Sequence, residues 1–488
     1  MTRKELLDLI HQDQDDGRDF SISAVTEDSR RVRRGALFVA VRGGHTDGHD
    51  FAEQAVKAGA AAILGDRQGV AELHGAPYVY CATPRRAAGI IAHALAGNPT
   101  RHMTVIGITG TNGKSSTAYL TQAVLQRAGH PTANFGTLGY QIAGEMHTAP
   151  HTTPFGEELA LLFMRARDAG QTHAVMEVSS HALDQDRVAG IHFTAGAFTN
   201  LSQDHLDYHQ DMDHYLRAKL RLFDLVEGAG CFTVVNADDP AAPQFIDASQ
   251  GRCITFGNAG DCRATQIRTE VGATRFTMHT PWGVTPVTLR LAGRHNVWNA
   301  LCATAITGGL GVPLDIIAEG LGALACVPGR FEAVDAGQDF HVIVDYAHTE
   351  DGLRNVLEAA RALCRGRIIT VFGCGGDRDK GKRPKMGATA ARLSDFCVVT
   401  SDNPRTEDPH RILLDIEVGL QRGGKRKNDD YLVIERREEA IRAAIGLARA
   451  GDLVMIAGKG HENYQIVGDQ RFPFDDREVA RTILSERR

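Results

Sequence analysis

The chain has 488 residues, which at roughly 150 residues per domain is enough for about three domains. Its 54 Lys and Arg residues are outnumbered by 60 Asp and Glu residues, and the net charge of −6 disfavours a general binder of nucleic acid or anionic membranes. The N-terminal segment MTRKELLDLIHQDQDD lacks the apolar core of a secretion signal, and no apolar run approaches the ~18 residues of a membrane span. We therefore expect a soluble, cytoplasmic protein with no nucleic-acid partner and no membrane span.

The nine cysteines are an odd number and include no CxxC pair. This pattern argues against a disulfide framework and against a zinc ribbon. We expect reduced, buried thiols.

Short apolar runs alternate with longer helical patterns along the whole chain, which predicts an α/β fold with buried parallel strands. The runs span residues 36–41, 61–64, 77–81, 103–108, 173–178, 231–236, 341–345, 367–372, 396–400 and 453–457. Within residues 260–290, alternating polar and apolar residues predict antiparallel strands. Loops near residues 82–84 and 326–329 suggest three domains, over residues 1–82, 83–327 and 328–488.

The segment MTVIGITGTNGKSSTAYL predicts a strand, a glycine-rich turn and a helix. The strand is expected to end near Ile108, and Gly110 and Gly113 let the backbone approach a polyphosphate. Lys114 would reach the β- and γ-phosphates, and Ser115 would offer its hydroxyl to Mg²⁺. The standard phosphate loop has glycine at the position of Ile108, so this is a shorter variant. A plain helix cap beside an incidental lysine is the alternative.

The TGTNGK loop resembles that of the Mur ligase superfamily, ATP-dependent amide-forming enzymes that include folylpolyglutamate synthases. Further segments resemble the family in order along the chain, from about residue 28 to 471. They are AVMEVSSHAL, FTNLSQDHLDYH, AGRHNVWNAL, VDYAHT, FGCGGDRDKGKRP, SDNPRTEDP and AGKGHENYQIVGDQR. The resemblance implies an N-terminal nucleotide-sugar-binding α/β domain, a central ATPase domain with a mostly parallel sheet, and a C-terminal Rossmann-like domain that binds an amino acid.

The family joins a carboxylate to an amine through an acyl phosphate, so two anions must meet and be neutralised. Glu177 follows an apolar strand, at the edge of a sheet where α/β active sites lie, and His205 follows another. Lys219 lies in a helical pattern and taken alone would be a surface lysine. The resemblance implies that Lys114, Glu177, His205 and Lys219 are catalytic, and that Lys219 is modified to a carbamate. It also implies Mg²⁺ held by Ser115, Glu177, His205 and the carbamate.

The resemblance assigns ATP, the co-substrate, to the phosphate loop, to the start of one helix and to the start of the third domain. These residues are Gly110, Thr111, Asn112, Gly113, Lys114, Ser115, Ser116, Asn296, Asn299, Arg330, Asp345 and His348. Glu350 stands where proline is common in the family, so the turn there is expected to differ slightly.

The family's acceptor is a UDP-sugar peptide, and the resemblance implies UDP-MurNAc-L-Ala-D-Glu. Arg187 suits an anionic group because its guanidinium binds with two donors. The residues assigned to this substrate are Ser29, Gly44, His45, Thr46, Thr152, Thr153, Ser179, Gln185 and Arg187.

The last domain is expected to select the amine. meso-Diaminopimelate differs from L-lysine by one extra carboxylate, and Arg405 in the DNPR tetrapeptide could bind that carboxylate and penalise lysine. The resemblance assigns meso-diaminopimelate to Arg378, Asp402, Asn403, Pro404, Arg405, Gly458 and Glu462.

Diaminopimelate addition in peptidoglycan precursor synthesis is therefore the leading hypothesis, by a chain expected to be monomeric. Lysine addition is the second alternative and is disfavoured by Arg405. Folylpolyglutamate synthesis is the third, and it leaves the N-terminal domain and the DNPR segment without a role. A non-catalytic nucleotide-binding protein is the fourth, and it conflicts with the retention of the phosphate, metal and carbamate residues.

Overall fold

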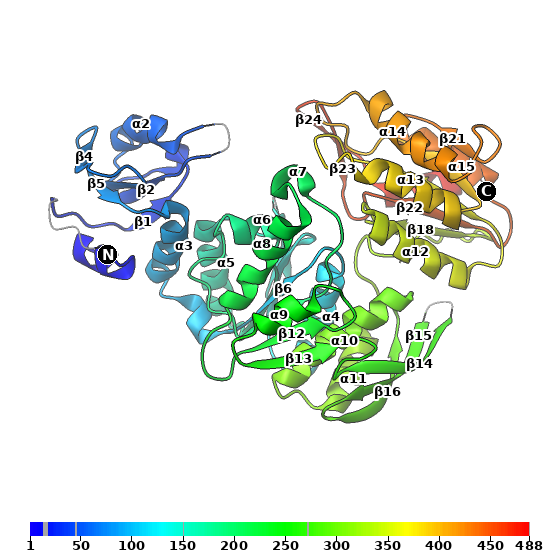
Figure 1. Ribbon diagram of the computed structural model, residues 1–488, viewed down its shortest axis with the longest axis horizontal. Coiled ribbons are helices and arrows are strands. Elements are labelled where there is room, and N and C mark those ends of the chain that lie inside the picture. The colour runs from blue at the N-terminus through cyan, green and yellow to red at the C-terminus, as the bar shows by residue number, and fades with distance from the viewer. Residues whose placement is uncertain (13–17, 44–45, 150, 271–272, 488) are drawn as a thin grey trace.

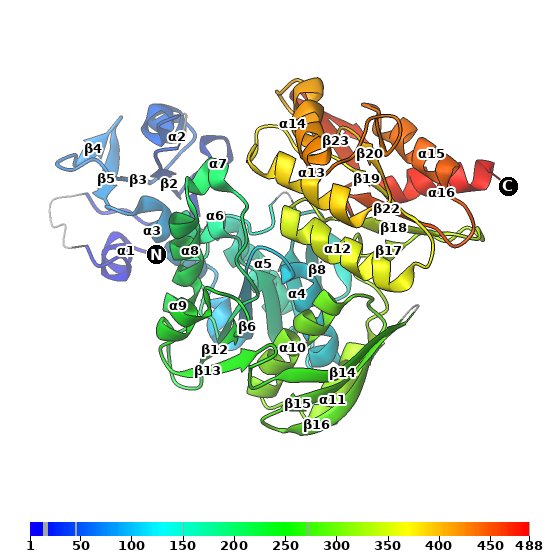
Figure 2. The same cartoon turned by 45° about the vertical axis from the view of Figure 1, so that its right-hand side comes forward.

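The computed structural model describes residues 1–12, 18–43, 46–149, 151–270 and 273–487. The chain forms three α/β domains, and the central domain lies between the other two (Figures 1 and 2). The three-domain α/β fold with mostly parallel sheets is as predicted. In the described parts of the chain, no helix has the length and apolar character needed to cross a lipid bilayer.

The N-terminal domain is built on a five-stranded sheet in the order β1-β2-β3-β5-β4, in which only β4 is antiparallel to its neighbour. Its strands are β1 (Ala24–Thr26), β2 (Ala36–Ala40), β3 (Ala62–Gly65), β4 (Glu72–Leu73) and β5 (Ala76–Tyr80). Its helices are α1 (Arg3–Leu9), η1 (Ser29–Arg31), η2 (Gly48–Phe51) and α2 (Ala52–Lys57). The following helix α3 (Pro84–Leu95) shares an apolar core with this sheet and also packs against the central domain. The predicted domain boundaries, after residues 82 and 327, stay predictions.

The central domain has an eight-stranded sheet in the order β13-β12-β11-β6-β10-β7-β8-β9, parallel from β13 to β7. Its strands are β6 (Thr104–Thr109), β7 (Thr132–Gly136), β8 (Gly139–Ile142), β9 (Glu145–His147), β10 (His173–Glu177), β11 (Ala195–Phe198), β12 (Phe232–Asn236) and β13 (Arg252–Phe256). A separate antiparallel sheet contains β14 (Arg263–Glu270), β15 (Ala273–Thr280) and β16 (Gly283–Leu289), as the alternating pattern predicted.

Helices cover both faces of the central sheet, and two apolar clusters fill the space beneath them. They are η3 (Pro99–His102), α4 (Lys114–Arg127), α5 (Gly156–Asp168), α6 (Ser180–Asp184), α7 (Leu206–His209), α8 (Met212–Asp224), α9 (Ala242–Asp247), α10 (Arg294–Gly309) and α11 (Leu314–Ala323). The strand register matters for function. Glu177 pairs with Ile108 across β10 and β6, and Phe198 pairs with Thr109 across β11 and β6. The segments that follow these three strands therefore begin side by side.

The C-terminal domain has a six-stranded sheet in the order β17-β18-β22-β19-β20-β21, parallel except for β17. Its strands are β17 (Glu332–Ala333), β18 (His341–Asp345), β19 (Ile368–Phe372), β20 (Phe396–Val399), β21 (Tyr431–Val433) and β22 (Leu453–Ala457), and β23 (Tyr464–Val467) and β24 (Gln470–Pro473) form a hairpin. Its helices are α12 (Glu350–Leu363), α13 (Lys382–Leu393), α14 (Pro409–Arg422), α15 (Arg437–Leu447) and α16 (Asp476–Glu486). The carboxyl ends of β18, β22, β19 and β20 share one edge of the sheet, as binding sites of open α/β sheets require.

Candidate active site

The phosphate loop connects β6 to α4, and α4 begins at Lys114 as predicted. Gly110 and Gly113 have φ of 146° and 86°, and a Cβ on Gly110 would lie 1.9 Å from Thr199 Oγ1. Only glycine fits there. Lys114 Nζ donates to the carbonyls of Gly110 and Thr111, both at 2.9 Å. Burial lowers the pKa of Lys114. The loop therefore surrounds its lysine with backbone carbonyls, beside the N-terminus of a long helix.

Glu177 is buried at the end of β10, next to this loop. Its two carboxylate oxygens accept hydrogen bonds from the Thr137 backbone N–H at 2.9 Å and from the Thr137 hydroxyl at 3.1 Å. A Cβ on Gly136 would lie 2.2 Å from Glu177 Oε1, so the strand end leaves room for this carboxylate. Ser115 Oγ accepts from Arg330 Nη2 at 3.1 Å, across the junction with the C-terminal domain.

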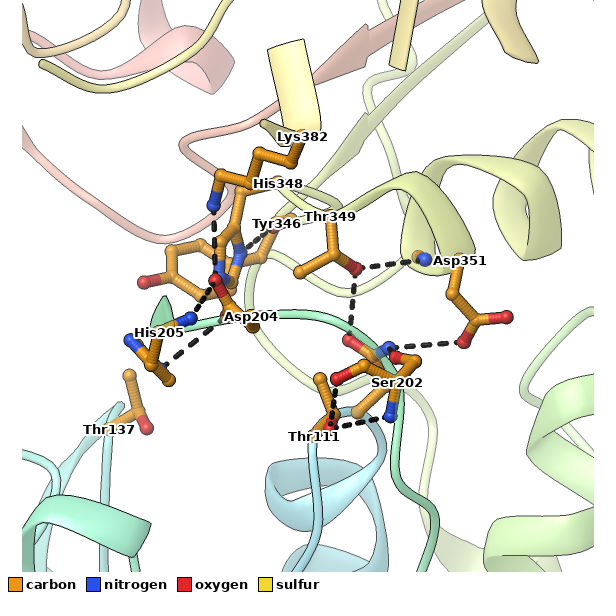
Figure 3. Close-up of polar contacts among 12 residues, drawn as sticks. Thr111, Thr137, Ser202, Asp204, His205, Tyr346, His348, Thr349, Asp351 and Lys382 are labelled. Atoms are coloured by element: carbon orange, nitrogen blue, oxygen red, sulfur yellow. Dashed lines mark hydrogen bonds and ion pairs between the residues drawn. The ribbon is translucent and has the colours of Figure 1, made fainter. Parts of the chain in front are cut away.

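Asp204 is the centre of a charged cluster between the central and C-terminal domains (Figure 3). Its carboxylate lies 3.4 Å from His205 Nε2, 3.5 Å from His348 Nε2 and 3.2 Å from Lys382 Nζ. Burial alone would raise the pKa of Asp204, but Lys382 and the two histidines outweigh it and hold the pKa well below its ordinary value. Burial lowers the pKa of His205 to about 3, so this imidazole is neutral at pH 7 and can bind a metal.

Lys219 lies on α8, the predicted helix, but it is not at the surface. Only 1% of the residue is exposed, and its Nζ lies 4.3 Å from the centre of the Tyr215 ring. Burial, with a smaller contribution from the positive charge of Lys114, lowers its pKa well below the ordinary value. The amine is therefore held in surroundings that favour its neutral form.

A cavity of about 800 Å³ lies between the phosphate loop and the start of the C-terminal domain. It brings together seven of the twelve residues predicted to bind ATP, namely Asn112, Gly113, Ser116, Asn299, Arg330, Asp345 and His348. Asn299 donates to Asn296 Oδ1 at 3.0 Å, so the predicted asparagine pair is a contacting pair. The helix α10 that carries both begins at Arg294, with Gly293 at its N-cap.

The C-terminal domain closes over the phosphate loop through direct polar contacts (Figure 3). Asn112 Nδ2 donates to Asp351 Oδ2 at 3.1 Å, and the Thr349 hydroxyl donates to Asn112 Oδ1 at 3.4 Å. Thr349 is also the N-cap of α12. The segment with Glu350 in place of the family's proline thus begins a capped helix whose first turn touches the loop.

The residues predicted to bind the sugar peptide fall into two groups. Thr153, Ser179, Gln185 and Arg187 are linked to one another, and Thr152 contacts Thr137, which holds Glu177. The Thr153 hydroxyl donates to the Glu177 carbonyl at 2.9 Å and accepts from Ser179 N at 3.0 Å, and the Thr152 and Thr137 hydroxyls lie 3.1 Å apart. Arg187 donates to Gln185 Oε1 at 2.7 and 3.0 Å and lies over the Phe155 ring.

The second group lies in the N-terminal domain. Ser29 donates to Gln54 Oε1 at 3.2 Å and lines a cavity of about 620 Å³ between this domain and the central one, together with Arg85 and Phe155. Thr46 is exposed and is not among the described residues that line this cavity. The predicted residues Gly44 and His45 lie outside the described residues.

The residues predicted to bind the amine come together at the edge of the C-terminal sheet. A Cβ on Gly458 would lie 2.6 Å from Asp402 Oδ2, and Asn403 Nδ2 donates to Glu462 Oε2 at 3.0 Å. Arg405 has a φ of 52° and donates through Nη1 to the Gly376 carbonyl at 2.8 Å. The remaining two predictions are also here. Pro404 packs its carbonyl against Gly376, and Arg378 is exposed beside Gly375.

Three residues with central positions were not predicted. Lys459 is fully buried between Asp402, Asn403 and Glu462. A lysine directly after the apolar run of β22, between two glycines, was a usable signal for it. Asp204 directly precedes the predicted residue His205, but no role was predicted for it. Lys382 is one of three basic residues in DKGKR, and sequence spacing could not tell which of them would point into the site.

These observations define a class: a three-domain α/β nucleotide-binding protein. Its phosphate loop faces a buried carboxylate, a buried lysine and the charged side chains of the C-terminal domain. Three family profiles match the chain. "Mur ligase family, catalytic domain" matches residues 21–96, "Mur ligase middle domain" residues 108–307, and "Mur ligase, glutamate ligase domain" residues 329–460.

Two curated relatives, from Syntrophomonas wolfei and Bacillus licheniformis, are each 45% identical over 96% of both chains. Both are named UDP-N-acetylmuramoyl-L-alanyl-D-glutamate–2,6-diaminopimelate ligase. A solved structure described with the same enzyme name has a TM-score of 0.69 and 31% identity, and the match covers 99% of each chain. The chain belongs to the Mur ligase family.

Proposed function

We propose that this chain is an ATP-dependent ligase that joins meso-diaminopimelate to UDP-MurNAc-L-Ala-D-Glu in peptidoglycan precursor synthesis. The observation that carries the proposal is the amine pocket. The DNPR segment, Gly458 and Glu462 meet at one sheet edge, and the same domain contacts the phosphate loop through Asp351 and the Asp204 cluster through Lys382. The enzyme names of the two relatives at 45% identity support the same activity.

The reaction has two steps. A carboxylate oxygen of the D-Glu residue attacks the γ-phosphorus of ATP, the bond to the β-phosphate oxygen breaks, and an acyl phosphate and ADP form. The neutral amine then attacks the acyl carbon, loses a proton, and expels inorganic phosphate to leave the amide. We assign the β- and γ-phosphates to Lys114 and the free N–H groups of α4. Arg330, which reaches Ser115, would add a positive charge from the C-terminal domain.

The residues near the phosphate loop fit Mg²⁺. Ser115 supplies a hydroxyl, Glu177 a buried carboxylate already oriented by Thr137, and His205 a neutral imidazole. In the described parts of the chain, no group of three or more His, Cys, Asp or Glu side chains is assembled as a metal site. Bound at these residues, Mg²⁺ would neutralise the charge on the phosphates. In our proposal, Thr137 orients the Glu177 carboxylate and Arg330 orients the Ser115 hydroxyl through the hydrogen bonds described above.

We propose that Lys219 carries the carbamate. Its neutral amine attacks CO₂, a C–N bond forms and one proton is released, so a neutral amine becomes an anion. Burial and the nearby charge of Lys114 both favour the neutral amine that this step needs. The product would place a negative charge near the positive charge of Lys114.

The two ends of the substrate pair fit the remaining groups. Arg187 is stacked on Phe155 and held by Gln185, and we assign it to an anionic part of the sugar peptide. Arg405 is anchored through Nη1, and we assign its other donors to the distal carboxylate of diaminopimelate. We also propose that the chain acts as a monomer.

The test is ADP release by the purified protein with Mg·ATP, UDP-MurNAc-L-Ala-D-Glu and meso-diaminopimelate. We expect turnover only when all three substrates and Mg²⁺ are present. Turnover with a folate and glutamate in place of the sugar peptide and diaminopimelate would support the folate-type alternative. ADP release that is unaffected by omitting either the acceptor or the amine would contradict the ligase proposal.

A further inference from the structure

We infer that Lys459 is a positioning residue for the amine substrate, which acts by holding Glu462 as a carboxylate and Asn403 in one amide orientation. The inference rests on the proposed function, because it concerns the same amine pocket. Lys459 itself was not among the residues that the family resemblance assigned to the amine.

The backbone around Lys459 is tightly confined. Gly458 has a φ of 119°, and a Cβ there would lie 2.6 Å from Asp402 Oδ2. Gly460 has a φ of 54°, and a Cβ there would lie 2.6 Å from the Gly329 carbonyl. Both positions therefore require glycine. Lys459 follows the last residue of β22 by two positions, and β23 begins at Tyr464, five residues further on.

The lysine side chain is directed into the protein, where its ammonium is fully buried. Nζ donates to the Tyr464 carbonyl at 2.7 Å, to Asn403 Oδ1 at 3.0 Å and to Glu462 Oε2 at 3.4 Å. An ammonium has three hydrogens, and three acceptors surround this one. Asp402 Oδ1 lies a little farther away, at 3.8 Å. The buried lysine is therefore held by the DNPR segment and by two residues that follow the lysine closely in the chain, Glu462 and Tyr464.

These contacts determine which way the Asn403 amide points. Asn403 Oδ1 accepts from both Lys459 Nζ and the Ile466 backbone N–H, at 3.0 and 2.9 Å. Asn403 Nδ2 then faces Glu462 Oε2 and donates to it at 3.0 Å. A flipped amide would turn its NH₂ group toward the ammonium and lose all three of these hydrogen bonds. Glu462 is therefore held through Oε2, and we assign Oε1 to the ammonium of the substrate.

Lys459 also provides the positive charge that lets two carboxylates share this pocket. Burial and the negative charge of Asp402 raise the pKa of Glu462, while Lys459 and Asn403 oppose the rise. For Asp402, Lys459 is the largest influence against burial, and its pKa stays below the ordinary value. The groups that face Glu462 from the surrounding elements are Asp402, Asn403, Lys459, Arg437, Tyr346 and Tyr464.

The test measures binding of meso-diaminopimelate to wild type and Lys459→Met by calorimetry, with ADP and the sugar peptide present, so that no turnover is needed. We expect Lys459→Met to bind diaminopimelate about 10- to 100-fold more weakly at pH 7, as for the loss of a hydrogen bond involving a charged group. The Kd should then improve as the pH rises, because loss of Lys459 raises the pKa of Glu462 further and a higher pH restores its carboxylate. Binding of ADP should not change.

Three comparisons separate positioning from a general effect on folding. Lys427→Met removes a lysine paired with Glu417 at 3.0 Å in the same domain and should leave binding unchanged. In a Glu462→Gln background, Lys459→Met should add little, because Lys459 acts through Glu462. Lys459→Gln removes the charge but keeps a donor, and it should show the same gain of affinity with rising pH.

Equal binding by wild type and a folded Lys459→Met variant would overturn the inference, and so would weaker binding with no dependence on pH. If neither Lys459 variant folds, Lys459 is a structural residue and the inference is wrong. Failure of the proposed function is distinguishable, because the wild-type protein would then neither bind nor turn over diaminopimelate.

Discussion

Lys382 of the C-terminal domain forms an ion pair with Asp204 of the central domain, with Nζ 3.2 Å from Oδ1 and both side chains buried. Lys382 is the first residue of α13, where a positive charge is opposed by the helix dipole. The nearby carboxylate offsets that cost. The pair joins the domain that we propose binds the amine to the domain that carries the phosphate loop, and His205 and His348 lie against the same carboxylate.

Replacing Lys382 should weaken closure of the two domains. Lys382→Met leaves the Asp204 carboxylate buried without its main partner, and removing one member of a buried pair costs about 3–5 kcal/mol. We expect kcat/KM for ATP to fall about 100-fold or more, and the radius of gyration with nucleotide bound to rise in small-angle scattering. Lys380→Met is the matched control, since that lysine is largely exposed. A Lys382→Met variant with wild-type kcat/KM would show that the pair does not contribute to closure.

The phosphate loop depends on the absence of a side chain at Gly113. A Cβ there would lie 2.5 Å from Asn299 Oδ1, and its φ is 86°. Gly113→Ala should weaken binding of a non-hydrolysable ATP analogue by about 10- to 100-fold, from strain of about 1–3 kcal/mol. Gly129→Ala is the control, because Gly129 has nearly the same φ, 82°, but a Cβ there would have nothing within 4 Å. The control should lose stability but keep its affinity, and equal affinity losses in both variants would argue against the contact with Asn299.

Carbamate formation at Lys219 predicts a dependence on CO₂ and on pH. The pKa of Lys219 lies well below its ordinary value, so the neutral amine that reacts with CO₂ is abundant above that pKa and is lost as the pH falls through it. Activity should therefore decrease at lower pH and on removal of bicarbonate. Lys219→Ala should lose most of its activity and recover part of it with a short carboxylic acid. A ¹³C carbamate signal from labelled bicarbonate should appear in wild type only, and wild-type turnover by Lys219→Ala would rule the modification out.

The stability of the protein should depend on His93, which is 1% exposed on α3. Burial lowers its pKa from 6.5 to about 4. The unfolded chain therefore binds a proton below about pH 6.5 that the folded chain does not, and the free energy of unfolding falls as the pH drops from there to about 4, by up to about 3 kcal/mol.

His93→Leu should remove this part of the acid sensitivity in urea unfolding measured at pH 7 and pH 4.5. His102→Leu, at an exposed histidine near the same helix, should keep it. If His93→Leu loses as much stability on acidification as wild type does, His93 is not the group responsible.

Much of the fold could be predicted because parallel strands that are buried on both faces consist of consecutive apolar residues. The runs at residues 341–345 and 453–457 coincide with β18 and β22, and the helix after the phosphate loop begins at Lys114 as predicted. Strand ends differed by a residue at several places. β6, for example, continues to Thr109, which pairs with Phe198 of β11. The apolar pattern alone does not predict this pairing, because threonine is polar.

The charged parts of the site were harder to predict, because burial of a charged side chain depends on the tertiary structure packed around it. Lys219 in isolation has the sequence of a surface helix residue, yet it is buried against Tyr215. Lys382 and Asp204 lie in different domains and meet only in the folded protein. Lys459 is similar, since one of its acceptors, Asn403, comes from a distant segment of the same domain. The roles assigned to individual site residues stay predictions.

The most direct test of the central claim compares wild type with Arg405→Met, supplying meso-diaminopimelate and L-lysine in separate reactions and measuring ADP release. We predict that wild type strongly prefers diaminopimelate. Arg405→Met should lose about 10- to 100-fold in kcat/KM for diaminopimelate, as for a lost charge-assisted contact, and change little for lysine. Wild-type turnover of lysine as fast as diaminopimelate, or an unchanged preference in Arg405→Met, would contradict the account.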